Sequence, residues 1–336
     1  MEFLLGVDQG STKTIAVVGD RNGNIFGIGY ADGACHSSDG LDLAMSLVKQ
    51  ACDQAILQAG IAPSQVRLLV GGLTGADWDH EYPLLQDALI RTMGIPSVHV
   101  QNDCVIAQRA GTDAGHSVVL CAGTGFNAAV QMPDGGRFIF GYYVNDDDHG
   151  GYALGKAAVV AVCNAHAGIG PYTRLTDAIL AYYGLSSVDD LLFRRIHQQL
   201  GPYKLVAPVL FDIVSSGDEV ARGIVENYGR SITRYALAGL RKIGDPELRT
   251  DVVLSGSIFK AKDRLLQKVI GETLAQQAPQ AVLADALYEP VVGAYLLGLD
   301  RIHGAKYALR NENLIASAGR FGLIRLPAEH KGLQTT

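Results

Sequence analysis

The segment Ser117-Val118-Val119-Leu120-Cys121-Ala122-Gly123-Thr124-Gly125-Phe126-Asn127-Ala128-Ala129-Val130 joins two apolar runs through a glycine turn. Its composition predicts two strands, and a Pro-Asp-Gly-Gly turn at 133–136 leads to a third strand over 137–140. Glycines on both sides of Thr124 let the backbone approach an anion, to which the turn offers N–H groups and a hydroxyl. We therefore expect this turn to bind phosphate.

The same arrangement occurs at the N-terminus. Residues 3–8 predict a strand, Gly10-Ser11-Thr12-Lys13 a polar turn, and 14–18 a second strand, which a turn at 20–24 connects to a third over 25–28. Two such units indicate an internal duplication. If the two turns face each other, Gly10, Ser11, Thr12 and Lys13 would share the phosphates of one nucleotide with Gly123, Thr124 and Gly125.

Two other nucleotide-binding motifs are disfavoured. Residues 123–128 match G-x-G-x-x-A, but a dinucleotide-binding loop must open a helix, and too few residues separate Gly125 from the turn at 133–136. The chain also lacks the G-x-x-x-x-G-K-[ST] sequence of a P-loop. A strand after the glycine turn therefore fits better than a helix.

Bulk composition describes an ordinary soluble protein. The 336 residues suffice for two domains, with 48% hydrophobic and 18% charged residues. A net charge of -6 does not favour a nucleic acid or an anionic membrane as partner. No apolar run approaches the roughly 20 residues of a membrane span. The five cysteines form no C-x-x-C pair, which is typical of reduced thiols, and Cys104 is expected to be a buried hydrophobe rather than a nucleophile. We expect a cytoplasmic location.

Strands alternate with helices along the chain. Apolar spacing predicts helices over 41–58, 84–93, 104–110 and 220–240, and strands over 66–70, 97–100 and 251–254. This order predicts an α/β fold with ligand sites at the carboxyl edges of the strands. With residues 111–115 as a linker, we expect one domain over 1–112 and a second over 113–300. Residues 301–336 show no strong period, and their packing is left open.

Two carboxylates follow predicted strands. Asp8 ends a buried strand, where a charge is costly unless it is paired, so it is interpreted as an outer-shell Mg²⁺ partner or as an aspartate capping its own turn. Asp103 follows Asn102 and would either accept the proton of an attacking hydroxyl or cap a helix. The spacing alone leaves both pairs of alternatives open.

The densest acidic run is Asp146-Asp147-Asp148-His149. A solvated loop and a metal site are the simple alternatives. Because the run leads into Gly150-Gly151, a substrate-facing loop is favoured, in which one aspartate binds ligand hydroxyls. His36 and His149, each taken alone, are expected at the surface.

Together these turns resemble the actin-like ATPase superfamily, and more closely the N-acetylglucosamine kinase and BadF/BadG/BcrA/BcrD ATPase family. The motifs occur in that family's order over roughly residues 3–300: Gly72-Leu73-Thr74-Gly75-Ala76-Asp77, Asn102-Asp103, Gly123-Thr124-Gly125-x-Asn127, Gly217-Asp218, Gly256-Ser257-x-x-Lys260 and Pro290-x-x-Gly293-Ala294. The resemblance implies two duplicated ribonuclease H-like domains with a cleft between them.

The resemblance also implies roles. Thr12 and Thr124 would contact ATP phosphates, Gly256, Ser257 and Lys260 would lie near the nucleoside, and Asp103 would be the catalytic base. The residues that the resemblance places at the sugar are His36, Ser37, Asn102, Asp103, Asn127, Gly141, Tyr142 and Asp148. The expected cofactors are ATP and Mg²⁺, the latter with Asp8. Dimers are common among similar proteins, which leaves a homodimer open.

Three residues depart from the family pattern. Tyr142 stands in place of a tryptophan, Phe126 in place of a small serine, and His149 in place of a glutamate. The predicted function is ATP-dependent phosphorylation of a sugar or amino sugar, N-acetylglucosamine first. The alternatives are an ATPase of the dehydratase-activator type, disfavoured because no cysteine sits in a suitable turn for an iron–sulfur cluster, and a non-catalytic sugar-binding relative.

Overall fold

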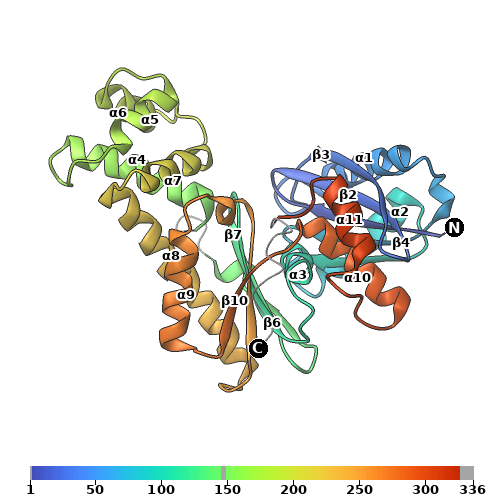
Figure 1. The fold of residues 1–336 in the computed structure, drawn as a ribbon. Helices are drawn as coiled ribbons and strands as arrows, with labels where there is room; N and C mark the ends of the chain where they lie inside the picture. Colours follow the sequence, from blue (N-terminus) through green and yellow to red (C-terminus); the bar gives the residue numbers. More distant parts are fainter. Residues whose placement is uncertain (1, 145–148, 326–336) are drawn as a thin grey trace.

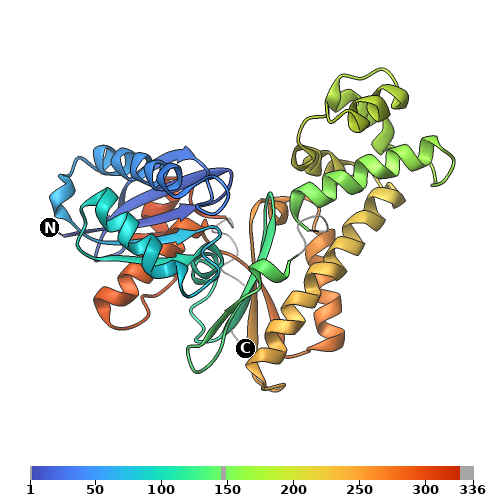
Figure 2. The same cartoon turned by 180° about the vertical axis from the view of Figure 1, so that it is seen from behind.

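The structure is a computed structural model that describes residues 2–144 and 149–325. It has two lobes, each built on a five-stranded sheet, and the two lobes lie side by side in both views (Figure 1, Figure 2). We call the lobe that holds the N-terminal sheet the first lobe and the other the second lobe.

The first sheet has the order β3-β2-β1-β4-β5. Its strands are β1 (Phe3–Gln9), β2 (Lys13–Asp20), β3 (Ile25–Asp32), β4 (Val66–Leu73) and β5 (Val98–Asn102). The first three strands form an antiparallel meander, and β4 and β5 add in parallel beside β1. The carboxyl ends of β1, β4 and β5 therefore meet at one edge of the sheet.

The second sheet repeats this plan, with the order β10-β9-β6-β7-β8. Its strands are β6 (Ser117–Ala122), β7 (Phe126–Gln131), β8 (Arg137–Ile139), β9 (Thr250–Ser255) and β10 (Ala281–Asp285). Again the first three are antiparallel and the last two add in parallel beside β6. Strand for strand, β6 to β10 match β1 to β5, so the predicted α/β fold with duplicated domains is confirmed. Because β7 is a strand, the glycine turn does not open a helix.

Helices cover both faces of the first sheet. On one face, α1 (Leu41–Ala59) and α2 (Glu81–Met93) pack their apolar sides into a core with β1 and β4. On the other face lie α10 (Pro290–His303) and α11 (Glu312–Arg320), whose buried residues join the strands in a second core. This second core contains the segments that are farthest apart in the sequence.

The position of α10 corrects the expected boundary at residue 300. Val291, Tyr295 and Leu299 are fully or almost fully buried in one cluster with Leu4 and Val70 of the first sheet. Residues 290–300 therefore pack with the first lobe, although they follow the last strand of the second. The apolar side of α10 packs against the face of the first sheet that α1 and α2 leave open. The order of the elements in the sequence does not indicate which of the two sheets α10 covers.

The helix α3 (Asp103–Arg109) lies between the lobes. It follows β5 directly, and its residues Cys104 and Ala107 pack against Val119 and Val253 of the second sheet. Cys104 is fully buried, as expected. Residues 111–116 then connect α3 to β6, in agreement with the predicted linker.

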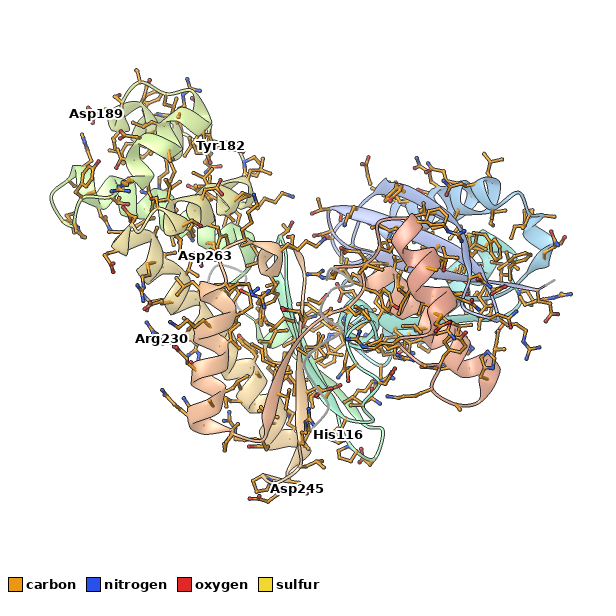
Figure 3. All side chains as sticks on the ribbon, in the orientation of Figure 1. His116, Tyr182, Asp189, Arg230, Asp245 and Asp263 are labelled. Atoms are coloured by element: carbon orange, nitrogen blue, oxygen red, sulfur yellow. The ribbon has the colours of Figure 1, made fainter. Side chains whose placement is uncertain are left out.

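The second lobe carries a helical extension between β8 and β9. It contains α4 (Gly150–His166), α5 (Leu175–Tyr183), α6 (Val188–Ile196) and α7 (Ala207–Ser215), while α8 (Glu219–Ile243) and α9 (Leu265–Gln277) pack on the sheet. Figure 3 shows Tyr182 and Asp189 in the outer part of this extension and Asp263 near its base. Within the described ranges, no helix is long and apolar enough to cross a membrane.

Several elements were not placed from the sequence, among them β10 and α11. The strand β10 is only partly buried along its whole length, so its residues lack the strong alternation that marks other strands. The helix α11 buries only Leu314, Ser317 and Ala318, two of which are small. Weak apolar signals of this kind become visible only when the neighbouring surface is known.

Candidate active site

The two predicted phosphate turns meet across the gap between the lobes. Thr12 lies between β1 and β2, Thr124 lies between β6 and β7, and their Oγ1 atoms are 3.0 Å apart. Lys204, in the helical extension, has its Nζ 3.5 Å from Thr12 Oγ1. Two hydroxyls and an ammonium group therefore gather at one point, which is an arrangement suited to phosphate oxygens.

A cavity of about 640 Å³ opens beside this point, which lies within the range of roughly 300–1,000 Å³ typical of ligand sites. Its polar end contains Thr12, Thr124 and Lys204. The remaining lining combines apolar and charged side chains: Leu205, Ala207, Pro208, Phe211, Asp212, Ser215, Ile258, Ala261, Lys262 and Asp263, together with the predicted Gly123, Ser257 and Lys260 and with Gly151. A polar end and a largely apolar body match the phosphates and base of a nucleotide.

Two backbone contacts hold the second phosphate turn in place. The N–H groups of Gly151 and Tyr152, in the first turn of α4, donate to the carbonyls of Gly123 and Thr124 at 2.8 and 3.2 Å. The start of α4 is thus joined to the turn, and Gly125 lies against Gly150. The helical extension therefore supplies Lys204 and also the N–H groups that hold the turn at Gly123 and Thr124.

Gly256 brings the predicted nucleoside loop close to the phosphate turn. Its φ of 105° is in the region that favours glycine, and a Cβ there would lie 2.1 Å from the carbonyl oxygen of Ala122. The following residues, Ser257–Lys260, form a short 3-10 helix at the cavity. Lys260 Nζ forms an ion pair with Oε1 of Glu289, the residue before α10, at 2.6 Å.

Asp103 is the first residue of α3, and the helix is capped by its neighbour. The side chain of Asn102 accepts a hydrogen bond from the Cys104 N–H at 2.8 Å, which makes Asn102 the N-cap. The alternative that Asp103 serves as the cap is therefore wrong. Its Oδ1 is buried and has no hydrogen-bond partner among the described residues. Burial, with a contribution from Asp77, raises the pKa of Asp103 to about 6, although hydrogen bonds from Cys104 and Thr74 oppose the rise.

Asp8, at the end of β1, is the residue expected to support a metal. Burial and the charge of Asp103 raise its pKa to about 7, Lys13 opposes this, and Glu289 adds to it. The described part of the chain holds no group of three metal-ligating side chains. Mg²⁺, however, keeps several waters and is usually held by one or two carboxylates together with substrate phosphates. A carboxylate whose charge is destabilised beside a phosphate-binding point fits such an ion.

Three of the residues expected at the sugar converge on Asp77. Asn102 Nδ2 donates to Asp77 Oδ1 at 2.6 Å, and Asn127 Nδ2 lies 3.5 Å from the same oxygen. Gly141 approaches so closely that a Cβ would lie 2.2 Å from Asp77 Oδ2. Burial and Glu81 raise the pKa of Asp77, while the two amides lower it. Residues of both lobes therefore surround one carboxylate.

Glu81, at the start of α2, contacts a second set of side chains and backbone groups. Its Oε1 lies 3.3 Å from His36 Nε2 and 3.5 Å from the Tyr142 hydroxyl, and its Oε2 accepts from the backbone N–H of Asp77 and of Trp78. The Trp78 and Tyr142 rings stack at 5.0 Å with an interplanar angle of 20°. About half of each aromatic side chain is exposed, so the pair offers an aromatic face at the cleft.

His36 and Ser37 lie on the loop before α1, where they contact Gly75 of the β4–α2 loop. The His36 side chain is only 8% exposed, which corrects the expectation of a surface histidine. Its Nδ1 is buried and lacks a hydrogen-bond partner among the residues that the structure describes. An unpartnered ring nitrogen beside Glu81 is suited to a polar ligand group.

The departures from the family pattern at Phe126 and His149 are packed against each other. Their rings stack at 5.4 Å, and each also contacts Tyr235 of α8 edge-on. His149 is 3% exposed, so this histidine is also buried rather than at the surface as expected. The pairing of the two changes explains why a large ring is accommodated after the glycine turn. Asp148 lies outside the described residues, as do Asp146 and Asp147.

Sequence reasoning missed several residues of this site. Asp77 ends a quoted motif and Trp78 follows it, yet nothing local assigned either a role, and Glu81 lies one helical turn further on. Lys204 is distant in sequence from both turns and belongs to no quoted motif, and Glu289, which directly precedes the motif at Pro290, was given no role. Gly10, Ser11 and Lys13 form the first turn, whose Gly10 N–H donates to the Lys13 carbonyl, but they do not line the cavity.

A duplicated α/β fold with one polar turn from each lobe at an interlobe cavity defines the class of two-domain, actin-like ATPases. The particular family follows from the sequence. The chain belongs to the BadF/BadG/BcrA/BcrD ATPase family, whose model matches residues 5–298.

Relatives and solved structures agree with this assignment. An N-acetyl-D-glucosamine kinase from Dictyostelium discoideum is 24% identical over 318 residues, covering 89% of this chain and 98% of that protein. A proposed N-acetylglucosamine kinase from Chromobacterium violaceum has a similar fold, with a TM-score of 0.69, 21% identity, and coverage of 88% of this chain and 99% of that one. A ROK family glucokinase from Streptomyces griseus, solved with glucose and AMPPNP, gives a TM-score of 0.56 at 18% identity, with 87% and 97% covered.

Proposed function

We propose that this protein transfers the γ-phosphoryl group of ATP to a hydroxyl of an amino sugar, with N-acetylglucosamine as the first candidate. The observation that carries the proposal is the 3.0 Å contact between Thr12 and Thr124 at the mouth of the interlobe cavity. The family and the kinases named among its relatives support it.

ATP would lie in the 640 Å³ cavity with its phosphates at the two turns. Thr12, Thr124 and the ammonium group of Lys204 would bind phosphate oxygens, and Gly256 would let the 257–260 loop approach the nucleoside. Lys204 is the one cation whose Nζ contacts a phosphate turn among the described side chains. A charged donor there would stabilise the negative charge of the transferring group.

Asp103 would act as the general base. A carboxylate with a pKa of about 6 is ionised at neutral pH yet is a stronger base than an ordinary aspartate. It would take the proton from the sugar hydroxyl as that oxygen attacks the γ-phosphorus. Its unpartnered, buried Oδ1 leaves the accepting atom without a competing donor among the described residues.

Asp8 would hold Mg²⁺, directly or through water, near the phosphates. The bound ion would offset phosphate charge during the transfer. The role of the protein's own residues is to place the carboxylate at the end of β1, beside the first phosphate turn.

The sugar would bind between the groups gathered by Asp77 and Glu81. Carboxylates and amides accept and donate hydrogen bonds to hydroxyls, while the exposed faces of Trp78 and Tyr142 suit the apolar face of a pyranose ring. His36 would add a ring nitrogen, whose Nδ1 has no hydrogen-bond partner among the described residues. Use of ATP and five free cysteines fit a cytoplasmic location.

The test is product formation across a panel of sugars. The purified protein is incubated with Mg²⁺, ATP and, separately, N-acetylglucosamine, glucosamine, N-acetylmannosamine or glucose, and both ADP and the phosphorylated sugar are measured. We expect ADP release that depends on an amino sugar and equals the amount of sugar phosphate. ADP release without sugar would favour the ATPase alternative. Sugar binding without ADP release would favour a non-catalytic relative.

A further inference from the structure

A second cavity lies between the lobes, and it shares no lining residue with the nucleotide cavity. Its volume is about 280 Å³. First-lobe residues of α3, α10 and the loop after α10 form one side, and second-lobe residues of β6, β7 and β8 form the other. None of the residues given a role in the reaction proposed above lines this cavity.

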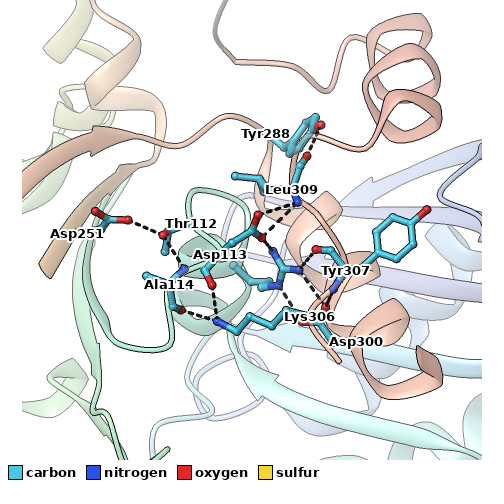
Figure 4. A network of polar contacts seen from close by, with 10 residues as sticks. Thr112, Asp113, Ala114, Asp251, Tyr288, Asp300, Lys306, Tyr307 and Leu309 are labelled. Carbon is cyan, nitrogen blue, oxygen red and sulfur yellow. Dashed lines mark hydrogen bonds and ion pairs between the residues drawn. The ribbon is translucent and has the colours of Figure 1, made fainter. Parts of the chain in front are cut away.

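Three cations line this cavity, namely Arg109, Arg137 and Lys306, whereas Asp300 is the one carboxylate in its lining. Arg109 is fully engaged. Its Nε and Nη2 donate to the two oxygens of Asp300 at 2.8 and 2.9 Å, and its Nη1 donates to Asp113 at 2.8 Å (Figure 4). Arg109 thus pairs with Asp300 and with Asp113.

Arg137 and Lys306 contact neutral groups instead. Arg137, on β8, donates to the side-chain oxygen of Gln101 across the lobe boundary at 2.6 Å. Lys306 donates to the carbonyls of Asp113 and Ala114 in the linker (Figure 4). Within residues 2–144 and 149–325, neither cation has a carboxylate within ion-pair distance.

The positive charges also repel one another. Burial, Arg109 and Arg137 lower the pKa of Lys306, although Asp300 and Asp113 oppose this, and burial, together with Arg301, lowers the pKa of Arg137, although Tyr82 opposes this. Two cations at a shared cavity, neither in an ion pair among the described residues, favour an anion as ligand. Arg137 and Lys306 come from different lobes, so an anion bound between them would contact both.

We propose that this cavity is a second binding site, specific for a small phosphate-bearing anion, either free phosphate or a phosphate monoester. Two cationic donors on opposite walls match the several acceptor oxygens of a phosphate group. The lining also contains Gln131 and Ser117, whose neutral polar groups can form hydrogen bonds with hydroxyls of an ester. The proposal does not rest on the proposed function.

The experiment is a calorimetric titration of the nucleotide-free protein with inorganic phosphate at constant ionic strength. The same titration is made on Arg137→Gln and Lys306→Gln. Each removes a charged donor, so each is expected to weaken phosphate binding by roughly tenfold or more. Because the two substitutions lie in different lobes, a folding defect in one leaves the other informative.

Two controls separate the outcomes. Arg67→Gln removes an exposed arginine that pairs with Glu2 on the first lobe, and it is expected to leave the affinity unchanged. Lys204→Gln removes the cation that contacts Thr12 in the nucleotide cavity, and it too is expected to leave binding at the second cavity unchanged. If phosphate affinity falls with Lys204→Gln but not with Arg137→Gln and Lys306→Gln, the anion binds at the nucleotide cavity and the proposal is overturned. An equal loss in Arg67→Gln, or no binding by the unsubstituted protein, would overturn it as well.

A second titrant identifies the source of the phosphate group. Glucose 6-phosphate is titrated into the same proteins. Tighter binding than that of inorganic phosphate, lost with Arg137→Gln, supports a monoester site, and equal or weaker binding supports a site for free phosphate. The outcome of the sugar-kinase assay does not affect either result, because the assay reports on the other cavity.

Discussion

Asp103 combines three properties that rarely occur together in a structural aspartate. It begins α3 without capping it, its Oδ1 is buried and lacks a partner among the described residues, and its pKa is raised to about 6. A buried carboxylate oxygen without a donor is costly, and such a cost is commonly retained at functional sites. These properties make Asp103 the strongest candidate for a functional carboxylate at the cleft.

We predict that Asp103→Asn lowers kcat by roughly 10²–10⁴-fold, the range typical of general acid–base catalysis. The amide keeps the size of the side chain but cannot accept the proton. Steady-state kinetics give kcat, and calorimetric titration with a non-hydrolysable ATP analogue gives nucleotide affinity, which we expect to be unchanged. Normal turnover by the variant would remove Asp103 from the mechanism.

The pH profile provides the complementary measurement. The base works only when ionised, so kcat/KM of the unsubstituted protein should fall as the pH drops through about 6, the folded-state pKa of Asp103. Above that pH the carboxylate is ionised and the rate should level off. The residual activity of Asp103→Asn should lack this acidic limb. The same limb in both proteins would assign it to another group.

At the scale of single elements, α8 shows how one side chain can hold two segments. Asp218 caps the helix by accepting from the Ala221 N–H at 2.8 Å, and it also accepts from the Arg174 N–H and the Thr173 hydroxyl. Its carboxylate thus ties the start of α8 to the segment before α5. Burial raises the pKa of Asp218, but these hydrogen bonds outweigh burial and hold it below the usual value.

We predict that Asp218→Ala lowers the free energy of unfolding by about 2 kcal/mol at pH 7, the upper range for a lost N-cap. Urea unfolding followed by circular dichroism measures the change. Because the folded-state pKa is depressed, the contribution should be present at neutral pH and lost as the pH falls through that pKa. The difference between the two proteins should therefore shrink in acid.

Asp42→Ala is the matched control. Asp42 also lies in the first turn of a helix, α1, but it is exposed and makes no cap hydrogen bond. We expect a change within about 0.5 kcal/mol, as for ordinary surface substitutions. Equal losses at positions 42 and 218 would show that the tertiary hydrogen bonds of Asp218 contribute nothing beyond the charge at a helix start.

At the scale of the whole molecule, the two lobes are joined where α3, α10 and the linker meet. Arg109 in α3 binds Asp300 in α10 and Asp113 in the linker, and its side chain is 5% exposed (Figure 4). Tyr288 adds a hydrogen bond from its backbone N–H to the carbonyl of Ala110. One buried cation, Arg109, therefore ties α3 and the linker to α10 of the first lobe.

We predict that Arg109→Ala lowers the free energy of unfolding by about 3 kcal/mol, because removal of one partner leaves the largely buried Asp300 carboxylate uncompensated. Urea unfolding at pH 7 measures this loss. In an Asp300→Ala background the same substitution should cost much less, since the uncompensated charge is gone. Equal costs in both backgrounds would mean that the ion pair does not couple the two helices.

More of the two glycine turns than of the proposed sugar site could be predicted from the sequence. Local sequence sufficed for the duplicated strand–turn–strand units and for the α/β class, because alternation and glycine turns are properties of neighbouring residues. That Thr12 and Thr124 face each other was a hypothesis from the duplication, and their contact depends on how the two lobes pack. Local sequence could not separate Asp103 as a base from Asp103 as a cap. That choice depends on which of two adjacent side chains, Asn102 or Asp103, reaches the Cys104 N–H.

Tertiary structure alone decided the rest. It placed α10 on the first sheet, brought Lys204 to Thr12, and gathered His36, Asn127 and Tyr142 around Asp77 and Glu81. These contacts join residues far apart in the chain, and each depends on how two separately formed surfaces pack. The sequence by itself determined the repeated unit and its phosphate turns, because short-range periodicity encodes them. Only the packed molecule determined which distant charges and rings share a cleft, because burial of an apolar face depends on the shape of the surface that covers it.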